Sequence, residues 1–232
     1  MQKELIEHLS TFVTPERLTL FETILKNRTF YFTVVLEDIY QPQNASAVLR
    51  TCDCFGIQNV NVIENRNIFN VNKEVALGSS KWLTIRKFTE KENNSLEAIK
   101  TLKKEGFRIV ATSPHSNDTF LDDFDVEKGK AAFIFGSELP GISETIMNEA
   151  DEFVKIPMYG FTESFNISVS AAILLHHLTN KLRNNKNVQW KLTSEEQDDV
   201  RLQWLRNTIK RSDLLEQLFE EQKNNLTTDS NQ

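Results

Sequence analysis

The chain has 232 residues, a formal net charge of −6 and a hydrophobic share of 39%. This length suits one large domain, or one domain with helical extensions, and allows a sizeable core. The sequence has no run of about 18 apolar residues, which a membrane-spanning helix would need. Its charged, amphipathic start lacks the apolar region of a signal peptide, so we expect a soluble cytoplasmic protein.

Charge is unevenly distributed along the chain. Residues 112–152 contain ten acidic and two basic side chains, whereas residues 181–211 contain eight basic and four acidic ones. The negative net charge argues weakly against a nucleic-acid partner. A locally basic face on an acidic protein can nevertheless bind phosphates.

The first half of the chain alternates predicted helices and strands. Residues 2–27 predict two helices, the second with Thr14 as N-cap and Pro15 in its first turn. Residues 30–36 predict a buried strand. Asn44 is expected to cap a helix from Ala45 to about Phe55, which Gly56 ends. We then expect strands and a helix at 59–63, 83–88, 95–105 (the helix) and 107–112, with no clear period over 65–82.

The second half begins with an acidic stretch, up to Lys130, that we expect to be loop and surface. Two short apolar runs, 131–135 and 153–158, predict strands, and a turn rich in Gly and Pro separates them. Asn166 then opens a helix that runs to about Leu182. A polar linker leads to the last predicted segments, an amphipathic helix over 193–222 and a disordered tail over 223–232.

This alternation predicts an α/β fold with a mostly parallel sheet covered on both faces by helices. We expect a central domain over 28–183, with helical extensions at 1–27 and 193–222. Strand-to-loop junctions rich in Gly and Pro that end at a helix N-terminus are typical of ligand sites in such folds. Ordinary connections between strands and helices would show the same pattern.

Cysteine and histidine do not indicate a metal site. Cys52 and Cys54 lie two positions apart on a predicted helix and face different directions, so they can neither pair nor share a metal. Buried, reduced thiols are the interpretation that this pattern favours. His176 and His177 are expected late in a helix, where the dipole favours a cation.

Three blocks of residues together resemble a known family. They are 44–51 (NASAVLRT) with Gly56, 134–142 (IFGSELPGI) closed by 156–158 (IPM), and 164–172 (SFNISVSAA). In this order they resemble the SpoU-type RNA 2′-O-ribose methyltransferases of the SPOUT class, over about residues 28–182. The flanking helices look most similar to the tRNA guanosine-2′-O-methyltransferase branch.

The resemblance implies a C-terminal trefoil knot, a rare exception to normal chain topology. It also implies a homodimer formed through the knot region and S-adenosylmethionine (AdoMet) as cofactor. Matching positions imply that the cofactor is bound by Thr112, Gly136, Ile156, Met158, Ser164 and Phe165. Apolar side chains and exposed backbone suit an adenine ring. Plain core packing is the alternative role for Ile156, Met158 and Phe165.

The catalytic residues implied by the resemblance are Arg50, Asn44, Glu138, Ser164 and Asn166. Arginine is a poor base because it keeps its proton in proteins. Arg50 is better suited to binding a neighbouring phosphate and stabilising a developing alkoxide. A surface salt bridge is the alternative. Asn44 is expected to place Arg50, and Glu138 to hold Asn44 or its own loop.

The reaction that the resemblance implies is AdoMet-dependent methylation of a ribose 2′-hydroxyl in RNA. The leading substrate is a guanosine in tRNA. The basic residues expected to contact RNA are Arg17, Lys26, Arg28, Arg50, Lys181, Arg183, Arg206, Lys210 and Arg211. Alternatives are the same reaction on ribosomal RNA, a non-catalytic RNA-binding assembly factor of the same fold, and a nucleotide-binding oxidoreductase. Against the oxidoreductase, no G-x-G-x-x-G motif follows a predicted strand.

Overall fold

The computed structural model describes residues 2–112, 119–138 and 140–229. The chain forms two compact units, one over Thr29–Lys191 and one that joins Met1–Arg28 to Leu192–Gln232. The first unit contains a β-sheet with helices, and the second is helical. Within the described ranges, no helix is both long enough and apolar enough to cross a membrane.

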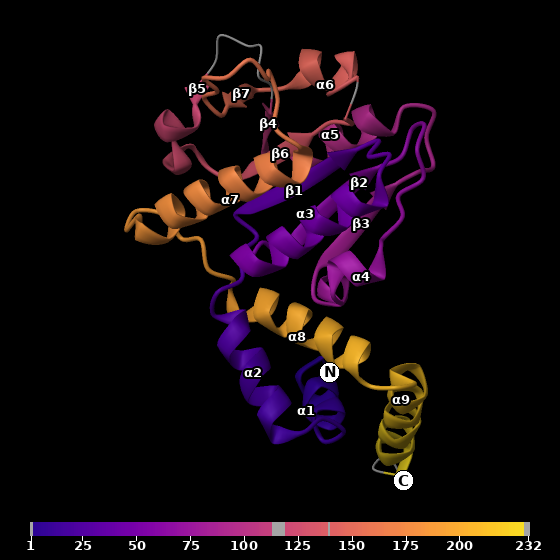
Figure 1. Cartoon of the computed structure of the whole chain (residues 1–232). Coiled ribbons are helices and arrows are strands. Elements are labelled where there is room, and N and C mark those ends of the chain that lie inside the picture. Colours follow the sequence, from indigo (N-terminus) through magenta and orange to yellow (C-terminus); the bar gives the residue numbers. More distant parts are fainter. Residues whose placement is uncertain (1, 113–118, 139, 230–232) are drawn as a thin grey trace. The chain divides into compact units, whose positions relative to one another are not determined.

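The sheet of the larger unit has seven strands in the order β3-β2-β1-β6-β4-β7-β5 (Figure 1). All its recorded strand pairings are parallel, which confirms the predicted sheet type. The trefoil knot implied by the resemblance stays a prediction. The strands are β1 (Phe32–Glu37), β2 (Asn59–Ile63), β3 (Thr84–Phe88), β4 (Arg108–Thr112), β5 (Thr119–Phe120), β6 (Ala131–Phe135) and β7 (Glu152–Lys155).

Helices cover both faces of this sheet. On one face α3 (Pro42–Phe55) and α7 (Ile167–Asn184) lie side by side, and on the other lie α5 (Asn94–Lys104) and α6 (Glu144–Glu149) (Figure 1). Each face of the sheet has its own hydrophobic core, and successive residues of a strand point alternately into one core and the other. In β1, Val34 packs on the side of α3 and α7, whereas Val35 packs on the side of α5 and α6.

Short elements complete the unit, namely α4 (Lys73–Ala76) and the 3₁₀ turns η1 (Ser79–Lys81), η2 (Leu121–Asp123) and η3 (Val126–Lys128). The last two correct the expectation that the acidic stretch is only loop and surface. Leu121, Phe124 and Val126 are buried in the core between exposed acidic residues. On such tight turns apolar and acidic neighbours point in opposite directions. Residues 113–118 of this stretch lie outside the described residues.

Helix α3 begins earlier than predicted. Its first residue is Pro42 and its N-cap is Gln41, so Asn44 lies inside the first turn and does not cap the helix. Proline suits this start because its fixed φ fits a helix. It also lacks an amide hydrogen, and an amide hydrogen in the first turn would have no acceptor within the helix. The predicted end is confirmed, since Gly56 takes a left-handed conformation with φ 75°.

The smaller unit consists of α1 (Gln2–Ser10), α2 (Pro15–Leu25), α8 (Ser194–Thr208) and α9 (Ser212–Asp229). The prediction of one helix over 193–222 is wrong. Backbone that is extended at Ile209 and left-handed at Arg211, with φ 61°, separates α8 from α9. The second helix continues past the predicted end at Gln222 to Asp229.

Both ends of the chain share one core in this unit. Leu9, Phe21 and Leu25 from the N-terminal helices are buried, as are Trp204 and Leu205 of α8. The Phe21 and Trp204 rings meet edge to face with centroids 5.3 Å apart. The two extensions therefore form one unit, and removing residues 193–232 would expose the N-terminal half of its core.

Candidate functional site

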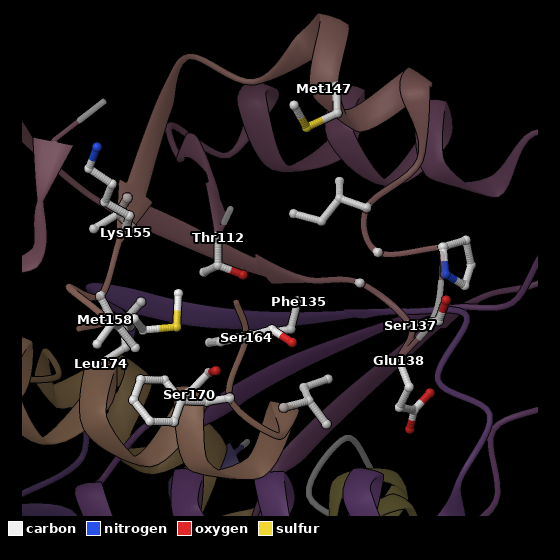
Figure 2. Close-up of a pocket in the computed structure, with 18 residues that line it drawn as sticks. Thr112, Phe135, Ser137, Glu138, Met147, Lys155, Met158, Ser164, Ser170 and Leu174 are labelled. Carbon is white, nitrogen blue, oxygen red and sulfur yellow. The ribbon is translucent and has the colours of Figure 1, made fainter. Parts of the chain in front are cut away.

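A cavity of about 460 Å³ opens beside the ends of three neighbouring strands (Figure 2). Thr112, Phe135 and Lys155, the last residues of β4, β6 and β7, line it. The carboxyl edge of a parallel sheet is where α/β folds usually bind ligands. The volume lies within the range of roughly 300–1,000 Å³ that is usual for small-molecule sites.

The walls of the cavity combine apolar side chains with hydroxyl groups and the charged Glu138 and Lys155. Figure 2 shows Met158 and Leu174 at one end and Glu138 with Ser137 at the other. The Thr112 hydroxyl donates a hydrogen bond to the Ile134 carbonyl at 2.8 Å. The structure places around this cavity all the residues that the resemblance assigned to the cofactor: Thr112, Gly136, Ile156, Met158, Ser164 and Phe165.

One wall is formed after β6 by residues 136–138 and 140–142, which we call the pocket loop. Ser137 and Gly141 exchange two backbone hydrogen bonds of 3.1 Å, so the loop folds back on itself. A Cβ atom on Gly136 would lie 2.2 Å from the carbonyl carbon and oxygen of Gly141. Only glycine allows this approach of two backbones.

A chain of hydrogen bonds joins the three blocks that carried the resemblance. Asn44 Nδ2 donates to Glu138 Oε1 at 2.7 Å and to Gln41 Oε1 at 3.2 Å. Asn166 Nδ2 donates to Asn44 Oδ1 at 3.1 Å. The Oδ1 of Asn166 meanwhile accepts from the Ser168 amide at 2.9 Å and caps α7. The expectation that Glu138 holds Asn44 is confirmed, and this contact replaces the capping role predicted for Asn44.

Arg50 lies apart from the cavity walls. It is exposed on α3, and its side chain forms no hydrogen bond or ion pair with any residue that the structure describes. The alternative of a surface salt bridge therefore has no partner among these residues. The guanidinium is available to an anion from outside.

The other basic residues predicted to contact RNA differ in their exposure and in the contacts that their side chains already make. Arg28 is only 2% exposed and lies over the Trp204 ring, which contradicts its expected contact with RNA. Arg206 forms two hydrogen bonds with Glu216, at 2.8 and 2.7 Å. Lys181 and Arg183 donate to the main-chain carbonyls of Asp122 and Phe55, and burial lowers the pKa of Arg183.

Four further predicted contacts, Arg17, Lys26, Lys210 and Arg211, are exposed. Lys210 and Arg211 form the turn between α8 and α9, and their side chains have no partner among the described residues. This turn thus presents two adjacent free cations.

Thiols and imidazoles form no metal centre in the part of the chain that the structure describes, where no suitable cluster of His, Cys, Asp and Glu occurs. Cys52 is buried but Cys54 is exposed, so the expectation of two buried thiols is wrong for Cys54. Two positions along a helix rotate a side chain by about 200°, from the core to the surface. His177 Nδ1 lies 3.6 Å from a carboxylate oxygen of Asp122.

Some cavity residues were missed by the sequence analysis, namely Met147, Lys155, Ser170 and Leu174. Ser170 and Leu174 are four positions apart and so lie on one face of α7. Their spacing within and just after the third block could have indicated them. Met147 comes from α6, which the sequence analysis did not predict.

Comparison with known proteins assigns the chain to a family. Residues 31–176 match the model of the SpoU rRNA Methylase family. This chain is a member of the SpoU methylase family. Similar curated proteins include the tRNA (guanosine(18)-2′-O)-methyltransferase of Borreliella burgdorferi, which is 41% identical over 91% of this chain and 94% of its own length. That of Thermus thermophilus is 35% identical over 70% of this chain and 81% of its own length.

Solved structures agree with this SpoU methylase fold. The A. aeolicus TrmH/SpoU tRNA modifying enzyme aligns with a TM-score of 0.74 and 27% identity, over 84% of this chain and 98% of that one. The SpoU methyltransferase AviRb from Streptomyces viridochromogenes, in complex with the cofactor AdoMet, aligns with a TM-score of 0.57 over 71% of this chain and 62% of its own. AviRb is 18% identical and supports the fold alone.

The geometry of the pocket loop predicts the effect of a substitution at Gly136. We expect Gly136→Ala to force the loop away from Gly141, to speed hydrogen exchange of the Ser137 and Gly141 amides, and to lower the free energy of unfolding by about 1–3 kcal/mol. The matched control is Gly160→Ala, whose Cβ would meet nothing closer than 4.0 Å. Equal exchange rates in the two variants would show that the loop tolerates a side chain at position 136.

Proposed function

We propose that this SpoU methylase transfers a methyl group from AdoMet to the ribose 2′-hydroxyl of guanosine 18 in tRNA. The observation that carries the proposal is the 41% identity, over nearly the full length of both chains, to a relative named for that reaction. The hydrogen-bonded residues Asn44, Glu138 and Asn166 beside a cavity of suitable size support it.

The cavity fits AdoMet in chemical terms. Apolar side chains such as Phe135, Ile156 and Leu174 suit the adenine ring, and the close backbone approach at Gly136 leaves main-chain groups at the wall. Thr112 and Ser164 add hydroxyl groups. When bound, AdoMet supplies an electrophilic methyl group on a sulfonium. AviRb, which has the same fold, was crystallised in complex with AdoMet.

The residues of this chain would prepare the ribose hydroxyl as nucleophile. Arg50, exposed and without a partner among the described residues, would hold the substrate phosphate next to the reacting ribose and stabilise the developing alkoxide. The phosphate oxygen would accept the hydroxyl proton, because arginine does not lose its own. Glu138, Asn44 and Asn166 would fix the pocket loop and the start of α7 around the reacting groups.

Nucleoside mass spectrometry tests the function directly. After incubation of unmodified tRNA with the protein and AdoMet, we expect 2′-O-methylguanosine, mapped to position 18 by nuclease digestion. A tRNA with adenosine at that position should remain unmethylated. Methylation of ribosomal RNA but not tRNA would favour the ribosomal alternative. Tight RNA binding without any methylation would favour a non-catalytic assembly factor.

Arg50 should affect turnover and not cofactor binding. We expect Arg50→Ala to lower turnover by a factor on the order of 100 or more, because charge in the transition state loses its partner. Arg50→Lys should also turn over slowly, since a point charge does not reproduce the planar guanidinium. AdoMet affinity by calorimetry should be unchanged, because Arg50 does not line the cavity. Arg66→Ala, another exposed arginine, is the control. Normal turnover of both Arg50 variants would refute the role.

The sequence over residues 112–152 is acidic, which disfavours the binding of RNA phosphates there. We propose that free cations provide the contacts, and Lys210 with Arg211 are such a pair. We expect Lys210→Gln combined with Arg211→Gln to weaken tRNA binding several-fold and to reduce the slope of log affinity against log salt by about two. The control is Lys223→Gln, because Lys223 is paired with Glu4. An unchanged salt slope would exclude this turn from the RNA contact.

We also propose that the protein is a cytoplasmic homodimer. Exposed apolar side chains around the start of α7, Tyr159, Phe161, Phe165 and Val169, support pairing through this region. Analytical ultracentrifugation at micromolar concentration that detects only monomer would contradict the dimer. The tRNA substrate supports the cytoplasmic location, which cell fractionation would test.

A further inference from the structure

A buried carboxylate lies at the end of β1, outside the cavity. Glu37 is 2% exposed and projects toward α5 and α6, on the same face of the sheet as Val35. No lysine or arginine pairs with it in the described part of the chain. A buried charge that lacks an ionic partner must be satisfied by hydrogen bonds.

Two serines and one backbone amide satisfy this carboxylate. The Ser143 amide donates to Glu37 Oε2 at 2.9 Å, and the Ser143 hydroxyl donates to Oε1 at 2.6 Å. The Ser95 hydroxyl, at the start of α5, also donates to Oε1. Ser143 accepts in turn from the Ile146 amide at 3.3 Å and caps α6.

Ser143 is the residue that immediately follows the pocket loop. Gly136 to Ile142 include six of the cavity-lining residues, Glu138 among them. The start of the loop is held by the exchange of backbone hydrogen bonds between Ser137 and Gly141. Its end is held by the two bonds that Ser143 donates to Glu37, whose Oε1 also accepts from Ser95 of α5.

We propose that Glu37 is a positioning residue for the methyltransferase site. It fixes the end of the pocket loop through Ser143, from the face of the sheet opposite to α3 and α7. The loop then keeps its position as a wall of the cavity and presents Glu138 to Asn44. This inference rests on the proposed function for its effect on AdoMet, but the effect on the loop itself is independent of it.

A carboxylate suits this position because its three hydrogen-bond partners among the described residues all act as donors to it. In Glu37→Gln the side-chain amide would either oppose the Ser143 backbone N–H or displace the two serine hydroxyls from their acceptor. At least one donor would lose its acceptor in either orientation, which is costly. The loop end would be released although no residue that lines the cavity has been replaced.

The chain offers a matched control. Ser95 and Ser143 both donate to the same oxygen of Glu37, but only Ser143 adjoins the pocket loop. Ser143→Ala removes the loop-side hydroxyl and Ser95→Ala the hydroxyl on the α5 side. Ser143→Thr keeps the hydroxyl and serves as the rescue.

The experiment compares these variants and Glu37→Gln in the full-length protein. Hydrogen exchange of the Ser137, Gly141 and Ser143 amides is measured without cofactor, and AdoMet affinity by calorimetry. We expect Glu37→Gln and Ser143→Ala to exchange about tenfold faster at these amides and to bind AdoMet about tenfold more weakly. Ser95→Ala and Ser143→Thr should stay within about twofold of the parent in both measurements, even where Ser95→Ala lowers the unfolding temperature.

Unchanged exchange in Glu37→Gln and Ser143→Ala would overturn the proposal, as would an equal effect of Ser95→Ala. If Glu37→Gln does not fold, the comparison of the three serine variants decides. If the parent protein binds no AdoMet, the proposed function fails, and the exchange rates still decide whether Glu37 holds the loop.

Discussion

The close approach of Gly136 to Gly141 is the constraint on which the site depends. A Cβ at position 136 would lie 2.2 Å from two backbone atoms, so the chain can turn here only with glycine. This turn lets the segment after β6 fold back and form a cavity wall, where a side chain at 136 would push it outward. The position of Glu138, two residues later, follows from the same turn.

The pocket loop is held from both faces of the sheet. On one face Glu138 accepts from Asn44 of α3, which accepts in turn from Asn166 at the start of α7. On the other face Ser143 donates to the buried Glu37. Side chains that touch a reacting group must be held by neighbours that are themselves fixed. Here short polar side chains from separate strands and helices provide that support.

Electrostatics separates two groups of basic residues. Arg28, Arg183 and Arg206 are occupied by a ring, a main-chain carbonyl or a carboxylate. Arg50 and the pair Lys210–Arg211 are exposed and lack partners in the described part of the chain. A cation without an internal partner can bind a phosphate without first breaking an ion pair. The net charge of −6 therefore says little about how RNA would bind.

Local pattern was enough to predict much of this protein. Apolar runs and caps predicted the parallel α/β sheet and most of its helices, because periodicity and capping are short-range effects. The three blocks of residues located the cavity wall, including Gly136, Ile156 and Met158.

The features that only the tertiary structure determined depend on contacts between segments that are distant in the sequence. Asn44 is a good cap by type, but its partners are Glu138 and Asn166, 94 and 122 positions away in the chain. Both ends of the chain share one core around Trp204, which neither end predicts alone. The role of Glu37 arises from Ser143, 106 positions later. Local sequence encodes which conformation each segment prefers, whereas such pairings exist only once the sheet has brought the segments together.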